Sequence, residues 1–234
     1  MNHSKDGIDF IVVSYYKPEY IKILVESIKK YVHCEYLVTV VANEKTSSDE
    51  YKELVNFYDG NSDVQVIEGT NQLSFEERGG MEGVKWTTDS LGNKIGPGSR
   101  NHGRGLTIGM KNTNNKYVCF LDVDTVFLNE WVDDILPLLE ESFFVSNRYD
   151  KGIAREMFMI FKREDFKKYD LYPDTSYVDN AGNITKHALD NKLSFVVLKN
   201  SAFGFDGSYI GDKSEHILDL PHGEQVYIND TPFF

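Results

Sequence analysis

Three near-continuous apolar runs, separated by two segments with helical spacing, restrict the fold of this chain more than any other feature. The runs are IDFIVVS at 8–14, LVTVVA at 37–42 and DVQVI at 63–67. Between them, 20–32 and 47–58 place apolar residues every three to four positions, as amphipathic helices do. Runs without polar alternation are typical of parallel strands that are covered on both faces. This order of elements predicts an α/β layered fold.

The rest of the chain continues the pattern less regularly. The segment 69–105 contains nine glycines and is expected to be a long loop, with a hairpin that turns at Gly92-Asn93. A short helix over 105–114 then leads into a fourth strand, KYVCFL at 116–121. Further elements are expected as a helix from Asn129 to about Pro137, strands at 143–146, 157–161 and 195–198, and a helix at 186–194.

Composition excludes several classes of protein. The chain has 234 residues, 41% hydrophobic and 26% charged, which is ordinary for one globular domain. The net charge of −12 argues against a nucleic-acid polymer as partner, because such partners leave a basic footprint. Two cysteines provide neither a disulfide framework nor a cysteine zinc site. No run approaches the roughly 20 apolar residues of a membrane helix, and no signal peptide is evident, so we expect a cytoplasmic protein.

Two aspartates one residue apart, Asp122 and Asp124, follow the fourth strand directly. If the chain stays extended there, residues two apart point to the same side, about 6.5 Å from each other. They also lie at the carboxyl end of a strand, where open α/β sheets bind ligands. Two carboxylates suit a hard cation such as Mg²⁺ or Mn²⁺. The alternative is a simple turn, but the apolar run before the pair and the lack of a following Gly or Pro favour an ion site.

At this point the chain resembles the GT-A nucleotide-sugar glycosyltransferases, especially the family-two-like group. FIVVSYYKPEYIKILVESI resembles the first strand and helix of that family, and GRGLTIGMKNTNNKYVCFLDVDTVF resembles its helix and metal-binding aspartates. The resemblance covers 8–134 well and the remainder weakly. It implies a single GT-A (Rossmann-like) domain, with a mostly parallel central sheet flanked by helices. About 8–134 would bind the nucleotide sugar, and about 135–234 would form the acceptor-binding half and the C-terminal tail.

The resemblance also implies roles for the residues at the strand ends. Asp124 would ligate a divalent metal, Mn²⁺ or Mg²⁺, that bridges the donor diphosphate. Asp122 would contact the donor ribose or reach the metal through water. Ser14 and Tyr15, just after the first strand, would line the nucleotide pocket.

Three further positions belong to the implied donor site. Asn43 and Glu44 follow the second strand, where the family contacts the base or ribose. The family more often has an Asp-containing turn there, so Asp49 stays open as an alternative to Glu44. Arg104 precedes the helix that leads into the aspartates, and its fixed fork of donors suits phosphate or sugar groups.

The acceptor side leaves more alternatives open. Many enzymes of the family take a third metal ligand from the tail, for which His222 is preferred over His216 because Pro221 and Gly223 indicate an ordered turn. An inverting transferase needs a general base near the acceptor hydroxyl. Asp179 is the first choice for this base, with Asp190 and Glu156 as alternatives. A retaining mechanism would not need it, and the sequence does not decide between the two mechanisms.

The function expected from the sequence is metal-dependent transfer of a sugar from a nucleoside-diphosphate donor to a hydroxyl of a glycan or other acceptor. A UDP-sugar is the expected donor by resemblance. A sugar-phosphate nucleotidyltransferase is a weaker alternative, because that class has a Gly-rich loop after its first strand and SYYKPEY has no glycine. A non-catalytic nucleotide- or glycan-binding module on the same fold is the other alternative.

Overall fold

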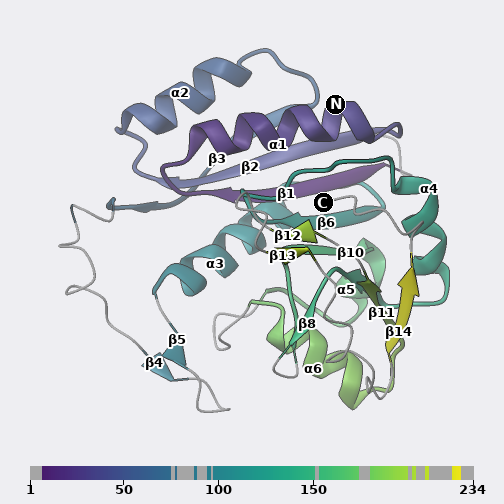
Figure 1. Ribbon diagram of the computed structural model, residues 1–234. Coiled ribbons are helices and arrows are strands. Elements are labelled where there is room, and N and C mark those ends of the chain that lie inside the picture. The colour runs from purple at the N-terminus through teal and green to yellow at the C-terminus, as the bar shows by residue number, and fades with distance from the viewer. Residues whose placement is uncertain are drawn as a thin grey trace.

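An eight-stranded sheet runs through the molecule, and helices cover both of its faces (Figure 1). The computed structural model describes residues 7–74, 77, 87–88, 94–95, 97–150, 153–173, 180–199, 202–203, 209–210 and 223–227. The first part contains β1 (Ile8–Ser14), α1 (Pro18–Tyr31), β2 (Tyr36–Glu44), α2 (Asp49–Tyr58), β3 (Val64–Gln72), β4 (Thr87–Thr88), β5 (Lys94–Ile95), α3 (Pro97–Lys111) and β6 (Tyr117–Leu121). The second part contains α4 (Val132–Ile135), a 3-10 helix (Leu136–Glu140), β7 (Phe144–Ser146), β8 (Tyr149–Asp150), β9 (Ile153–Ala154), β10 (Phe158–Lys162), α5 (Arg163–Lys168), α6 (Gly182–Asp190), β11 (Phe195–Lys199), β12 (Ala202–Phe203), β13 (Tyr209–Ile210) and β14 (Gly223–Tyr227).

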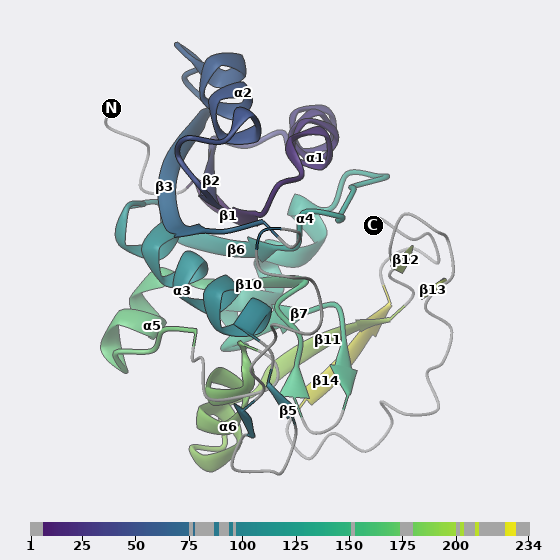
Figure 2. The same cartoon turned by 90° about the vertical axis from the view of Figure 1, so that its left-hand side faces the viewer.

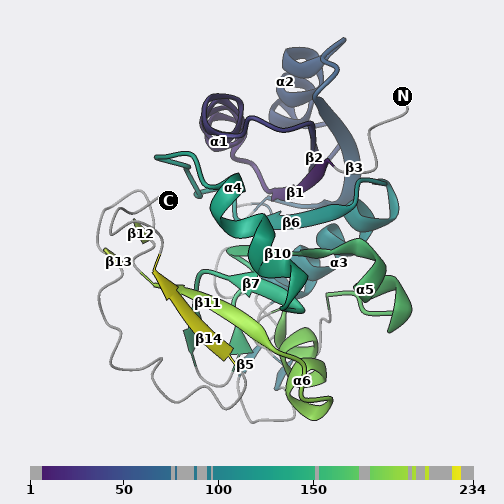
Figure 3. The same cartoon turned by 90° about the vertical axis from the view of Figure 1, so that its right-hand side faces the viewer.

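The strand order of the main sheet is β14-β11-β7-β10-β6-β1-β2-β3. Every paired neighbour is parallel except β10, which runs antiparallel to both β6 and β7. The predicted mostly parallel α/β sheet is therefore confirmed. Figure 3 shows β11 and β14 at the opposite edge of the sheet from β3. Among the described residues, no helix is long and apolar enough to cross a bilayer.

The apolar run of β1 is continuous because both faces of the sheet are buried. Ile8, Phe10 and Val12 pack into the core beneath α1 and α2, whereas Ile11 and Val13 pack into a second core beneath α3. Figure 2 shows α1 and α2 on one side of these strands and α3 on the other. All seven residues of β1 are buried, so the strand has the limits that the sequence predicted.

Helix α3 begins earlier than the sequence indicated. The glycine-rich stretch up to 105 was expected to be a loop, but α3 starts at Pro97. Glycine is a poor helix former, yet here it allows a close approach to the sheet. A Cβ atom at Gly105 would lie 2.8 Å from Val13, and one at Gly109 would lie 2.3 Å from Ile11. The glycines therefore reflect packing of α3 onto β1.

Other boundaries differ by a few residues. Residues 69–72, expected in the loop, extend β3, and α6 begins four residues before the predicted position 186. The helix expected from Asn129 forms only at Val132–Ile135 and continues as a 3-10 helix that contains Pro137. β4 and β5 pair antiparallel, as the predicted hairpin requires, although its turn at 92–93 lies outside the described residues.

A buried ion pair joins several elements at the amino edge of the parallel strands. The Asp9 carboxylate accepts hydrogen bonds from Arg163 Nη2 at 2.6 Å, the Asn115 backbone N–H at 2.7 Å and Asn115 Nδ2 at 2.9 Å. Arg163 also donates to the carbonyl oxygens of Met110 and Asn115 and to Thr113 Oγ1. One guanidinium thereby connects β1, the end of α3, the approach to β6 and the start of α5.

Candidate functional site

The sheet topology brings the ends of four strands together at its carboxyl edge. β6, β1 and β2 are adjacent and parallel, so Asp122, Ser14 and Glu44 lie at the same edge. β10 runs the other way, with Phe158 opposite Leu121, so Glu156 reaches this edge just before β10 begins. Ligands of open α/β sheets bind at such an edge, which makes this the candidate site.

The two aspartates lie in a turn rather than in an extended strand. β6 ends at Leu121, and the Thr125 N–H donates to the Asp122 carbonyl oxygen at 3.1 Å. The Asp122 N–H and Thr125 Oγ1 both donate to the Met157 carbonyl oxygen, which fixes the turn to the start of β10. The expectation of an extended chain here is wrong. Asp122 is half-buried within the turn, and Asp124 is exposed.

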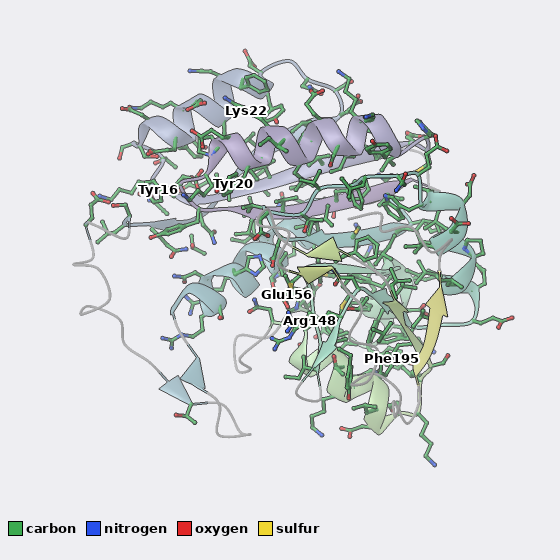
Figure 4. The ribbon with its side chains drawn as sticks, in the orientation of Figure 1. Tyr16, Tyr20, Lys22, Arg148, Glu156 and Phe195 are labelled. Atoms are coloured by element: carbon green, nitrogen blue, oxygen red, sulfur yellow. The ribbon has the colours of Figure 1, made fainter. Side chains whose placement is uncertain are left out.

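A histidine that the sequence analysis did not select lies beside Asp122. His102, on α3, places Nε2 3.6 Å from Asp122 Oδ1 and Nδ1 3.5 Å from Glu156 Oε1. Asn180 Nδ2 donates to Glu156 Oε1 at 3.0 Å and lies 3.1 Å from His102 Nδ1. Figure 4 labels Glu156, which lies on the side of the sheet that α3 covers. Residues from four separate segments thus form one polar cluster.

The cluster concentrates negative charge in a partly buried space. Burial raises the pKa of Asp122 to about 6, with Glu156 and Asp124 adding to the rise and His102 and Arg155 opposing it. Burial by itself would lower the pKa of His102, but Glu156 and Asp122 raise it above its usual value. Carboxylates held this close together favour the approach of a cation.

The polar residues at the ends of β1 and β2 face the protein interior. Ser14 Oγ donates to Glu44 Oε1 at 3.1 Å, and both side chains are fully buried. Burial raises the pKa of Glu44, and its Oε2 is buried without a hydrogen-bond partner among the described residues. Asn43 donates to the Asn101 carbonyl oxygen and accepts from the Thr70 N–H, so it links β2 to α3 and β3. Their predicted contacts with the nucleotide stay predictions.

A cavity of about 680 Å³ opens beside these strand ends, lined by residues that follow β1, β2 and β3. Tyr15 and Tyr16 line it and donate hydrogen bonds to the carbonyl oxygens of Leu73 and Gln72, at 2.6 and 2.9 Å. Lys45 lines the cavity as well. Tyr15 therefore lies at a cavity, as a residue of the predicted nucleotide pocket would.

The remaining predicted residues have different positions. Arg104 lies within α3, not before it, and its side chain is exposed. Asp190 lies on α6 and pairs with Lys186 on the surface. Asp179, His216 and His222 lie outside the described residues. Sequence spacing could not indicate His102, because its partners come from segments that are distant along the chain.

The chemistry of the edge suits a divalent cation with few protein ligands. Asp122 and Asp124 supply the hard carboxylate oxygens that Mg²⁺ and Mn²⁺ prefer. Within the described ranges, no group of three or more His, Cys, Asp or Glu side chains could hold a metal ion. A cation at Asp122 and Asp124 would therefore take its remaining ligands from outside the described side chains, for example from water or a bound ligand.

The strand order, with carboxylates after β6, gives the chain a fold of the GT-A class, as predicted. Two solved structures with this fold are S. aureus TarS 1–349, at TM-score 0.51 and 15% identity, and the mannosyltransferase PcManGT from Pyrobaculum calidifontis, at 0.50 and 13%. The matches cover 76% and 77% of this chain but only 54% and 52% of theirs, so the chain spans about half their length. No family model and no curated protein matches the sequence.

The two structures are known with ligands. TarS 1–349 has been crystallised in complex with UDP, at TM-score 0.50 and 15% identity, over 75% of this chain and 53% of that one. The structure of PcManGT is a complex with GDP-Man and Mn²⁺. At these levels of identity, the similarity shows a shared fold.

Proposed function

We propose that this protein is a metal-dependent glycosyltransferase that moves a sugar from a nucleoside-diphosphate donor to a hydroxyl acceptor. The observation that carries the proposal is the Asp122–Thr125 turn, which presents two aspartates at the same edge of the sheet as the cavity beside Tyr15. The nucleotide and Mn²⁺ complexes of proteins with this fold support it.

The donor would lie across the ends of three strands. The nucleoside would occupy the cavity at Tyr15 and Tyr16, and its diphosphate would extend past β1 toward Asp124. β2 and β6 both neighbour β1, so about 10 Å separates them at the usual strand spacing. Lys17 and Lys45 line the cavity as cations, and Lys45 pairs there with Glu77 at 2.6 Å. A UDP-sugar is the proposed donor.

Asp124 is the proposed direct ligand of Mn²⁺ or Mg²⁺, because its side chain is exposed and can reach a bound cation. Asp122, half-buried beside His102, would support the same ion or contact the ribose. A bound cation would offset the charge that develops on the departing diphosphate. His222 stays the proposed third ligand.

The proposed general base for an inverting reaction is Asp179. It directly precedes Asn180, whose side chain contacts His102 and Glu156 at the site. This adjacency in the sequence supports the choice of Asp179. Glu156 is itself hydrogen-bonded to Asn180 and buried, which suits a structural role better than proton transfer from an acceptor.

The test of this proposal is Asp124→Ala, assayed for Mn²⁺-dependent transfer and donor hydrolysis with UDP-sugars and GDP-mannose. We expect activity to fall by at least about 100-fold, since Lewis-acid stabilisation contributes several kcal/mol. Asp133→Ala removes another exposed carboxylate, on α4, and should leave activity unchanged. Unchanged activity in Asp124→Ala would contradict the metal role, and nucleotide binding without turnover of any donor would favour a non-catalytic module.

A further inference from the structure

His102, on α3, contacts both Asp122, an aspartate of the proposed metal site, and Asn180, which lies just before α6. Its contacts run from the interior outward. Asn180 is 2% exposed and the Glu156 side chain 9%, whereas the His102 and Asp122 side chains are 22% and 30% exposed. A buried pair therefore anchors a partly exposed pair.

The hydrogen bonds define the orientation of the imidazole. The Asn180 amide has two N–H donors, and its Nδ2 lies within reach of both Glu156 Oε1 and His102 Nδ1. If the Asn180 amide were rotated by 180°, its oxygen would lie against Glu156 Oε1. The Glu156 carboxylate therefore fixes which amide atom faces it. Nε2 of His102, 3.6 Å from Asp122 Oδ1, is the ring nitrogen that faces the aspartate, whereas Nδ1 faces Asn180 and Glu156.

A glycine next to the histidine makes this contact possible. A Cβ atom at Gly103 would lie 2.4 Å from Asn180 Oδ1, closer than atoms can approach. Gly103 therefore lets Asn180 lie directly against α3 beside His102. The close packing at Gly103 and the contact between Asn180 and His102 both place Asn180 directly against α3.

We propose that His102 is a positioning residue: held by Asn180, it directs the Asp122 carboxylate toward the cation and diphosphate. The inference rests on the proposed function. Through His102, Asn180, which precedes α6, would orient Asp122, an acid of the proposed donor site. Partners that orient metal-binding carboxylates typically contribute 10- to 100-fold in metal affinity or activity.

The test measures Mn²⁺ affinity by electron paramagnetic resonance titration with UDP present, and UDP affinity without metal by calorimetry. His102→Ala and Asn180→Ala should each weaken Mn²⁺ binding by about 10-fold or more, with UDP affinity unchanged. His102→Gln, whose amide nitrogen can take the place of Nε2, should restore most of it. The double variant should be no weaker than either single one, because the two residues act through one contact.

His33→Gln is the matched control, because His33 is exposed and pairs with Glu130. Three outcomes would overturn the inference: unchanged Mn²⁺ affinity in His102→Ala, a loss of UDP affinity as large as the loss of Mn²⁺ affinity or a lowered melting temperature, or a bound-nitrogen signal in the Mn²⁺ spectrum that disappears in His102→Ala. If Asp124→Ala abolishes Mn²⁺ binding but His102→Ala leaves Mn²⁺ affinity unchanged, only this inference fails. If wild type with UDP binds no Mn²⁺, the proposed function itself fails.

Discussion

The two edges of the parallel strands use similar polar residues for different purposes. At the amino edge, Asp9 and Arg163 meet at 2.6 Å with side chains 1% and 7% exposed. At the carboxyl edge, His102 lies 3.5 to 3.6 Å from Glu156 and Asp122, and the Asp122 side chain is 30% exposed. The first arrangement is closed and holds elements together. The second has carboxylates beside a histidine at longer distances and with more exposure, as we expect for the proposed cation site.

Two elements take part in both edges and so connect them. β10 carries Glu156 just before its first residue and Arg163 just after its last, because it runs antiparallel to its neighbours. α3 carries His102 toward the carboxyl edge, and its Met110 carbonyl oxygen accepts from Arg163 at the amino edge. The scaffold that positions the candidate site is therefore tied to the buried pair at the opposite edge.

Arg163→Met should have the largest effect on stability. It leaves the Asp9 carboxylate buried without its cation, and breaking such a pair typically costs about 3–5 kcal/mol. Urea unfolding at pH 7 measures the loss. The Asp9→Asn, Arg163→Met double variant should recover part of it, because the uncompensated charge is gone. A loss below about 1 kcal/mol would show that the amino edge is not the structural anchor that its geometry indicates.

How far the sequence predicts this molecule depends on whether a feature is local. The limits of β1 follow from its own residues, because both faces of the strand are buried. The start of α3 does not, because Gly105 and Gly109 reflect the distance to β1 rather than local preference. The aspartate pair was found from its place after an apolar run, but its turn depends on Met157. His102 could not be selected from the sequence, because its partners lie 20 to 78 positions away.

Glu44 lies at the carboxyl edge but is as buried as Asp9 at the amino edge. Glu44→Gln tests how the burial of this carboxyl group affects stability. Burial raises the pKa of Glu44 above 4.5, so the folded state resists its ionisation. The stability that the neutral form provides is present below the unfolded pKa and is lost as pH rises through the folded pKa. Glutamine cannot ionise. The free energy of unfolding of Glu44→Gln relative to wild type should therefore increase between pH 4.5 and pH 8, by less than the Arg163 effect.

Urea unfolding of both proteins at several pH values measures this change, and the pH dependence separates it from any constant cost of the new amide. A difference in unfolding free energy that does not vary with pH would mean that burial does not raise the pKa of Glu44. A parallel titration with UDP sharpens the comparison of the two edges. Weaker UDP binding in Glu44→Gln would support its predicted contact with the base or ribose, whereas unchanged binding would assign Glu44 to the scaffold with Ser14.

Asp190→Ala should have the smallest effect and tests the alternative general base. Asp190 pairs with Lys186 one helical turn earlier, with both side chains 59% exposed. Such pairs contribute about 0.3–0.5 kcal/mol, and less when the lysine precedes the acid. Transferase activity should not change. α6 begins beside Asn180 at the site, and at 1.5 Å per residue Asp190 lies about 12 Å further along the helix. A tenfold loss of activity would contradict this placement, because no direct proton transfer spans that distance.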